Sequence, residues 1–299
     1  MGKISLLAIL NIEDIRKQIF RLLVTEEINV TMLALRFVRK NLTIAFETYL
    51  KAELPHLTRP ERYQICTQVA SSGNLKTFKW VHEIGFYWNA GTSSSAAFYG
   101  HLEVLKWARM HGCPWNSSTC SNAARNGHLE ILKWAHGNGC SWSHTTCSSA
   151  ALGGHLEVLK WARENGCEWD SSTCSIAADY GHLEVLKWAR ANNCPWDNYT
   201  CSNAAAGGYL EVLKWAIENG CEWGDTFMEA VRNDYLEILK WAHANDHEWN
   251  TDIYSIAIKK GYLEIVIWAY QNGCPYNNHI LLQILEKWPD IIIFDKKYR

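Results

Sequence analysis

The chain has 299 residues, of which 48% are hydrophobic and 20% charged, and its net charge at pH 7 is −2. This composition is typical of a folded chain rather than a disordered one. A nearly neutral chain has no long-range field to attract nucleic acid or an anionic membrane, so we expect neither as a partner. The apolar run at residues 4–12 is too short to span a bilayer and lacks a cleavage site, which predicts an intracellular, cytoplasmic protein.

Residues 1–60 do not repeat, and their pattern predicts helices at residues 12–24, 30–38 and 42–54. Two interpretations of this segment stay open. It is either a helical cap over the apolar side of the first repeat or an F-box-like docking segment. The second interpretation depends on Asp14-Ile15, Ile19-Phe20 and Leu23, which resemble the start of an F-box. The segment departs from that motif where an F-box has Leu-Pro, because it has Asn11-Ile12 there.

One motif recurs through the rest of the chain. Gly-His-Leu-Glu-Val-Leu-Lys-Trp-Ala begins at Gly100 and returns almost unchanged 27 residues apart, with looser copies on either side. One interval is 26 residues, between Gly208 and Asp234. Eight copies predict a solenoid of stacked repeats. Counting the first residue of each copy as position 1, the copies begin at Gly73, Gly100, Gly127, Gly154, Gly181, Gly208, Asp234 and Gly261.

This count explains the unusual content of 16 Trp and 11 Cys. Fifteen of the Trp residues occupy positions 8 and 16, and all of the Cys residues occupy positions 14 and 21. Positions 3–12 predict a helix whose apolar arc covers about 220° of the wheel, so it must be covered on two sides. Asn165-Gly166 predicts the end of this helix in one copy. Positions 20–27 predict a second, shorter helix, capped by Ser and Thr as in residues 171–173.

The residues from Ser118 to Trp134 resemble the ankyrin repeat, because they align without gaps to its Thr-Pro-Leu-His-x-Ala-Ala and Gly-His-Leu-Glu-Val-Val-Lys segments. The resemblance covers residues 61–279 and implies an all-α, ankyrin-type solenoid of helix-turn-helix repeats. An ankyrin repeat has about 33 residues, so a copy of 27 implies shortened hairpin loops. The Trp- and Cys-rich variety resembles arrays of large DNA viruses of protists, which implies the host cytoplasm. Residues 280–299 are expected to form a C-terminal cap, with Leu281, Leu282, Leu285 and Trp288 packing inward.

The cysteines and histidines do not have the spacing of a metal site. Cys113 and Cys120 are seven residues apart, whereas structural zinc ligands are usually paired two to four residues apart. A reduced compartment argues against disulfides. The His that begins each long helix, such as His101, is replaced by Tyr209 in a later copy, which favours a residue that bridges loops over a ligand. We therefore expect no metal and no cofactor, and the absence of catalytic motifs predicts that the chain is not an enzyme.

Positions 23, 26 and 27 of the second helix lie opposite its core positions 21, 24 and 25 on the wheel, and they vary most among the copies. Ankyrin arrays, by resemblance, bind with this inner face, which implies a monomeric scaffold for a protein partner. Arg125, Ile176 and Tyr180 are the expected anchors. The alternatives are that these positions drift without a contact, or that the chain is a substrate receptor of a ubiquitin ligase. The predicted partner-binding residues are Asn122, Arg125, Asn126, Ser149, Leu152, Ile176, Asp179, Tyr180 and Asn203.

Overall fold

The computed structural model describes residues 58–247 and 252–289, and every element within these ranges is an α-helix. The predicted all-α class is therefore confirmed. The chain divides into two units, residues 1–168 and 169–299. The helices predicted at residues 12–24, 30–38 and 42–54 lie outside the described residues, as do residues 290–299 of the expected C-terminal cap.

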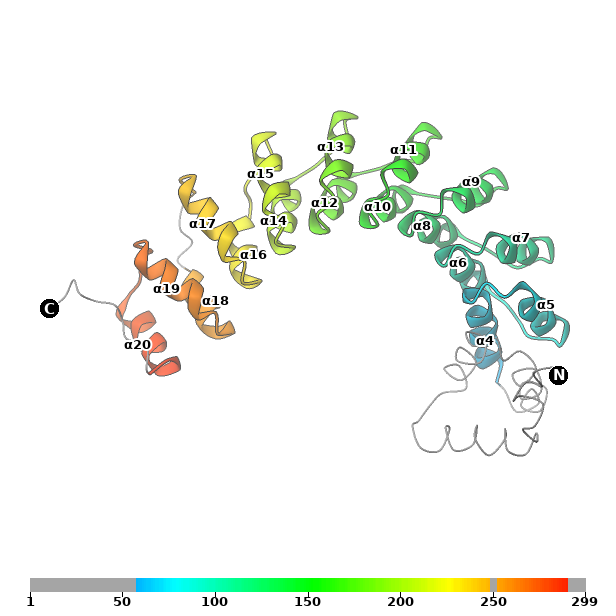
Figure 1. Cartoon of the computed structure of the whole chain (residues 1–299), viewed down its shortest axis with the longest axis horizontal. Coiled ribbons are helices and arrows are strands. Elements are labelled where there is room, and N and C mark those ends of the chain that lie inside the picture. The colour runs from blue at the N-terminus through cyan, green and yellow to red at the C-terminus, as the bar shows by residue number, and fades with distance from the viewer. Residues whose placement is uncertain (1–57, 248–251, 290–299) are drawn as a thin grey trace, which may run out of the picture. The chain divides into compact units, whose positions relative to one another are not determined.

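Each unit is built from helix pairs. We call the helix that ends just before position 1 an A helix and the helix that begins at position 3 a B helix. Figure 1 shows the A helices of the first unit side by side in one row and its B helices in a second row. The A helices of the first unit are α4 (Arg59–Ser71), α6 (Ala90–Phe98), α8 (Ser117–Arg125) and α10 (His144–Leu152). Its B helices are α5 (Leu75–Glu83), α7 (Leu102–Met110), α9 (Leu129–Gly137) and α11 (Leu156–Glu164).

The second unit continues the same alternation of A and B helices. Within it, successive A helices again pack against one another. Its A helices are α12 (Ser171–Asp179), α14 (Asn198–Ala206), α16 (Thr226–Arg232), α18 (Ile253–Lys260) and α20 (Asn278–Lys287). Its B helices are α13 (Leu183–Ala191), α15 (Leu210–Glu218), α17 (Leu236–Ala244) and α19 (Leu263–Gln271).

The ends of the B helices follow from residues that the repeat keeps constant. In α11, Glu157 lies in the first turn, where the helix dipole favours a negative charge, and it pairs with Lys160 at 2.7 Å. Gly166 adopts φ +84° after the helix, and the backbone N–H of Cys167 donates to the carbonyl of Ala162 at 2.9 Å. This left-handed glycine and its backward hydrogen bond are a Schellman-type ending. The predicted span of positions 3–12 is confirmed to within one residue.

Most of the A helices begin two residues earlier than the sequence predicted. Helix α8 starts at Ser117, and its N-cap is Asn116, whose side chain accepts a hydrogen bond from the backbone N–H of Ser118 at 3.1 Å. Asp170 caps α12 in the same way. For these two helices the prediction of a Ser or Thr cap is wrong, because an Asn or Asp stands just before the Ser-rich run and caps at least as well. Ser143 is the N-cap residue of α10, as predicted. Helix α8 is also not shorter than α9, since both have 9 residues, whereas α16 with 7 residues and α18 with 8 are shorter, as predicted.

Alanines pack between neighbouring A helices, and branched aliphatic residues pack between the two layers of helices. Ala123 and Ala124 of α8 are fully buried, and their small side chains let neighbouring A helices approach closely. Ile131 and Leu132 of α9 fill the space between the layers and are at most 3% exposed. The predicted apolar sandwich around the B helices is therefore confirmed for these aliphatic residues.

The Trp residues form edge-to-face pairs between successive repeats. The position-16 Trp of one repeat meets the position-8 Trp of the next, as for Trp142 and Trp161, whose ring centroids are 5.8 Å apart at 67°. Both rings are half-buried rather than fully buried. A position-10 residue often covers the position-16 ring, and His136 stacks on Trp142 at 3.6 Å. Equivalent pairs are Trp88–Trp107 and Trp115–Trp134 in the first unit, and Trp169–Trp188 and Trp196–Trp215 in the second.

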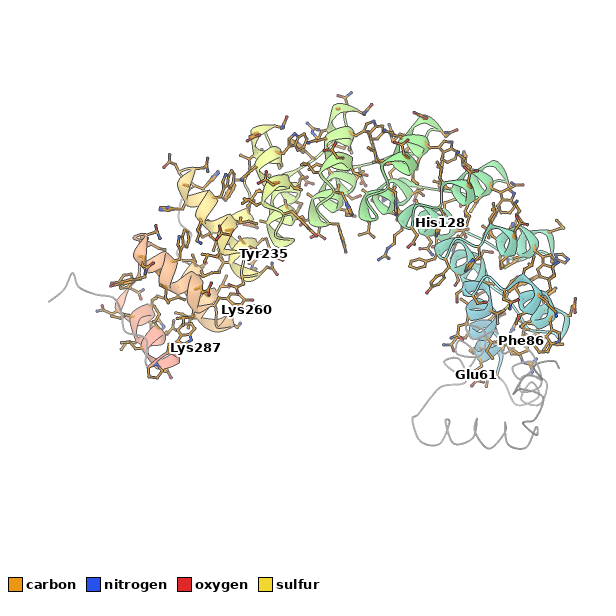
Figure 2. All side chains as sticks on the ribbon, in the orientation of Figure 1. Glu61, Phe86, His128, Tyr235, Lys260 and Lys287 are labelled. Carbon is orange, nitrogen blue, oxygen red and sulfur yellow. The ribbon has the colours of Figure 1, made fainter. Side chains whose placement is uncertain are left out.

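The position-2 residue joins neighbouring loops, as the His-to-Tyr exchange predicted. The Nε2–H of His128 donates to the carbonyl of Phe98 at 3.1 Å, and in the second unit the hydroxyl of Tyr262 donates to the carbonyl of Arg232 at 3.3 Å. Figure 2 labels His128 at the loop between α8 and α9. The loops from B to A helices are short, with residues 111–116 joining α7 to α8, and no strand occurs in the part of the chain that the structure describes. The predicted shortening of the hairpins is confirmed.

The last described helix corrects one packing prediction. In α20, Ile284 is buried, but Leu282 is 66% exposed and Leu285 is 38% exposed. Leu281 and Trp288 are half-buried. The prediction that Leu282 and Leu285 pack inward is wrong, because α20 packs on α18 and that contact covers a single face of the helix.

Candidate partner-binding surface

Positions 23, 26 and 27 lie on the open side of each A helix and at its C-terminal end. In α8, Arg125 is exposed, and Asn122 and Asn126 are half-buried. Cys120, at core position 21 of the same helix, is fully buried. The helical wheel therefore separated the buried side from the open side correctly.

Some of the predicted partner-binding residues are also used within the fold. The Asn122 side-chain amide donates to the carbonyl of Ser94 at 3.3 Å, and the amide of Asn203 donates to the carbonyl of Ser175 at the same distance. Each bond joins an A helix to the A helix before it. The amide of Asn126 donates to the carbonyl of Asn122 at 3.1 Å. These asparagines therefore hold the surface in register.

The remaining predicted residues lie on helices of both units. Ser149 and Leu152 are half-buried on α10 in the first unit. In the second unit, Ile176 and Asp179 are half-buried on α12, and Tyr180 is 48% exposed at its end. Partial burial raises the pKa of the Asp179 carboxyl above its usual value. Each unit thus carries its own part of the candidate surface.

The sequence analysis missed the same positions in the copy that begins at Gly73. Phe98 and Tyr99 stand at positions 26 and 27 there, at the end of α6. Their ring centroids are 4.9 Å apart in an edge-to-face arrangement, and Tyr99 is 48% exposed. The guanidinium carbon of Arg125 lies over the Phe98 ring, 6.0 Å from its centroid. Applying the position count to this looser copy would have found both aromatic residues.

The sequence analysis also omitted the end of the second unit, where the 26-residue interval shifts the position count. Arg232 ends α16 and forms an ion pair with Glu229. Lys259 and Lys260 end α18 and are exposed. The Nζ of Lys287 donates to the carbonyl of Lys259 at 3.4 Å, which is the bond that a position-2 ring makes in other repeats. Lys260 and Lys287 are labelled on these neighbouring helices in Figure 2.

The outer face of the B helices is uniform by comparison. Glu157 and Lys160 pair in the first unit, and Glu184 pairs with Lys187 at 2.9 Å in the second. The glutamates of these pairs are about three-quarters exposed, and exposed ion pairs contribute little to stability. Because six of the eight described B helices offer the same compensated pair, these positions present a repeated rather than an irregular surface.

The cysteines act as buried hydrogen-bond donors. The Sγ of Cys140 donates to the carbonyl of Asn116 at 3.3 Å, and the Sγ of Cys167 donates to the carbonyl of Ser143 at the same distance. Burial raises the pKa of the Cys113 thiol to about 11, which keeps that thiol protonated. Within residues 58–247 and 252–289, no three His, Cys, Asp or Glu side chains are grouped so that they could hold a metal ion.

The helix pairs, their constant motif and the bridged loops define an all-α solenoid of tandem repeats. A similar solved structure is the crystal structure of the human ASB11 ankyrin repeat domain, with 20% sequence identity and a TM-score of 0.44. The similarity covers 53% of this chain and 84% of that one. No protein-family model and no curated protein matches the chain. Among the described helices, none combines the length and apolar character needed to cross a membrane.

Proposed function

We propose that the chain is a protein-binding scaffold that holds its partner on the open side of the A helices, at positions 23, 26 and 27. The observation that carries this proposal is the strong variation of these positions among copies whose packing positions stay nearly constant. The packing residues of a solenoid must match from copy to copy, because each copy packs on the next. A surface that contacts one irregular partner needs a different residue in each copy instead.

Exposure and residue type support the choice of anchors. Arg125 in the first unit and Tyr180 in the second are exposed, and Arg and Tyr are enriched among the residues that dominate interface energies. Ile176 adds an apolar side chain that the fold buries only in part. Arg125 and Tyr180 both lie at the C-terminal end of an A helix, so in each unit the partner is expected to contact these ends.

The test isolates a partner with the full chain by pull-down from host cells and then measures its Kd. Arg125→Ala alone and the pair Ile176→Ala with Tyr180→Ala are each expected to weaken binding about tenfold or more, with an unchanged melting temperature. Lys160→Ala and Lys187→Ala, on the outer face of the B helices, are the matched controls and should bind the partner with unchanged affinity. Full affinity in a variant that combines all three changes on the open side of the A helices would contradict the proposal.

A second candidate function is that of a substrate receptor of a ubiquitin ligase. It depends on the F-box-like stretch from Asp14 to Leu23, in residues that lie outside the described ranges. In this case the N-terminal segment would dock to the ligase, and the open side of the A helices would hold the substrate. Capture of an F-box adaptor protein by the full chain would support this function, and failure to capture it would favour a scaffold alone.

A further inference from the structure

The side chain of Arg125 is held in place but has no polar partner. Its guanidinium is exposed and lies over the Phe98 ring. Within the described ranges, Arg125 alone among the arginines has neither a hydrogen bond from its side chain nor an ion pair. Arg109 and Arg190 donate to the carbonyls of Cys113 and Cys194, for example, and Arg59, Arg62, Arg163 and Arg232 also have partners.

Within residues 58–168, no acid stands at the positions equivalent to that of Arg125 on the neighbouring A helices. Positions 23, 26 and 27 of α4, α6, α8 and α10 hold Ser, Asn, Gln, Gly, Leu, Phe, Tyr and this one Arg, with no Asp or Glu. The glutamates in the first turn of α7, α9 and α11 are paired with lysines, as Glu130 is with Lys133 at 2.9 Å. Among the described residues of the first unit, positions 23, 26 and 27 therefore present a single positive charge with no acid at the same positions.

Neighbouring residues fix the position of this charge. The backbone carbonyl of Arg125 lies so close to Gly153 of α10 that an added Cβ there would be 2.0 Å from the oxygen. The guanidinium carbon of Arg125 lies over the Phe98 ring, 6.0 Å from its centroid, which is within reach of a cation–π contact. This contact leaves the N–H donors of the guanidinium for other groups.

We propose that the first unit receives an Asp or Glu side chain of its partner protein at Arg125, beside the exposed ring of Tyr99. The guanidinium fork matches the geometry of a carboxylate and can donate two parallel hydrogen bonds to it. Arg125 is the binding residue, and Phe98 is a positioning residue that acts through it. This inference rests on the proposed function, and it assigns a chemical class to the part of the partner that contacts α6, α8 and α10.

The test begins with a random peptide library displayed on phage and selected on the full chain. Enriched peptides are expected to carry Asp or Glu at one fixed position. One such peptide, made with an amidated C-terminus so that only side-chain carboxylates remain, is then measured by fluorescence anisotropy. Arg125→Gln should weaken its binding at least about tenfold, because a lost charge-assisted bond of this kind is worth one or more decades in Kd. Lys133→Gln, which removes the same charge from the B face, should bind like the unaltered chain.

A double-mutant cycle assigns the contact. Replacing the acidic residue of the peptide with its amide should weaken binding to the unaltered chain. The same replacement should leave the affinity of the Arg125→Gln variant unchanged. Phe98→Leu should reduce the preference for the acidic peptide over its amide. Arg125→Lys should retain part of this preference, more than Arg125→Gln and less than the unaltered chain. Higher salt should weaken the acidic peptide and not its amide counterpart.

The outcomes separate this inference from the proposed function. An amide peptide that keeps full affinity, or equal binding by Arg125→Gln, would overturn the carboxylate assignment. If the Leu152→Ser variant still binds that peptide more weakly than the unaltered chain, the open side of the A helices remains the binding surface and only the carboxylate assignment fails. If neither Arg125→Gln nor Leu152→Ser weakens binding, the surface itself is wrong.

Discussion

Two glycines of one repeat adopt the same backbone conformation but have different surroundings. Gly100 has φ +83° and Gly112 has φ +85°, a region in which an L side chain is strained. A Cβ added to Gly112 would have no atom within 4 Å, whereas one added to Gly100 would lie 2.8 Å from the His128 ring. That ring must also stay in place to bond the carbonyl of Phe98.

The two Gly→Ala substitutions therefore separate backbone strain from the close contact. Gly112→Ala should reduce the free energy of unfolding by about 1–2 kcal/mol, the cost of a left-handed L residue. Gly100→Ala should cost at least about 1 kcal/mol more, because the His128 ring must move and its hydrogen bond weakens. Urea denaturation of both variants measures the difference. Equal losses would show that the ring relaxes without cost.

His82 is expected to make stability depend on pH. Its ring stacks on Trp88 at 3.9 Å, and its pKa is lowered from 6.5, first because burial disfavours the charged form and then because His111 lies nearby. As the pH falls below the pKa of His82 in the unfolded chain, the unfolded chain binds a proton that the native ring does not yet bind. Unfolding is thereby favoured, so the melting temperature should fall between about pH 7.5 and about pH 5.5.

The matched variant for this pH effect is His82→Arg. Arg occupies the same position in other repeats, where the guanidinium carbon of Arg109 lies 4.1 Å from the ring centroid of Trp115. Arg keeps the stacking contact and remains charged in both the folded and the unfolded chain, so its melting temperature should fall less over the same pH range. An unchanged pH dependence would mean that His82 titrates normally.

At the scale of elements, the edge-to-face Trp pairs should couple neighbouring repeats. Trp161 is half-buried, so Trp161→Ala should cost about 2 kcal/mol, less than a fully buried Trp. Trp142→Ala with Trp161→Ala should cost less than the sum of the two, with a coupling of about 1 kcal/mol, because each removes the same ring contact. Thermal or urea unfolding of the three variants gives the coupling.

The control for the Trp pair is a second cycle between rings that do not touch. Trp107 pairs with Trp88 rather than with Trp161, so Trp107→Ala and Trp161→Ala should be additive within about 0.5 kcal/mol. Coupling in this second cycle as well would mean that the substitutions spread through the unit rather than acting across one ring contact.

The elements differ in how far they could be predicted from the sequence, for physical reasons. The B helices were predictable because an apolar arc and an Asn-Gly ending define them locally. The starts of the A helices were missed because Asn116 and Asp170 compete with the Ser-rich run that follows them as N-caps. The open side of the A helices could be read from the wheel. The bond from Asn122 to Ser94 and the stacking of Arg125 on Phe98 could not, because they depend on how adjacent repeats align.

At the scale of the whole molecule, bonds between adjacent repeats make each unit a chain of nearest neighbours. Cysteines take part in these bonds, since the Sγ of Cys194 donates to the carbonyl of Asp170 at 3.4 Å and the Sγ of Cys140 bonds Asn116 in the first unit. The stability of such an array is approximately the sum of its repeats and their interfaces. It therefore depends in part on thiols that pack and donate between neighbouring repeats.

The same arrangement predicts that removing metal ions leaves the fold intact. A cysteine binds a metal ion as its thiolate, but burial raises the pKa of Cys66 to about 12 and that of Cys274 to about 11, so these two thiols stay protonated at neutral pH. Dialysis against a strong chelator should leave the helical circular dichroism and the melting temperature unchanged. A zinc-finger peptide dialysed in parallel should lose its structure, which checks that the treatment removes zinc. Loss of helicity in this chain, or zinc at one or more equivalents in elemental analysis, would contradict the prediction and assign the cysteines to metal binding.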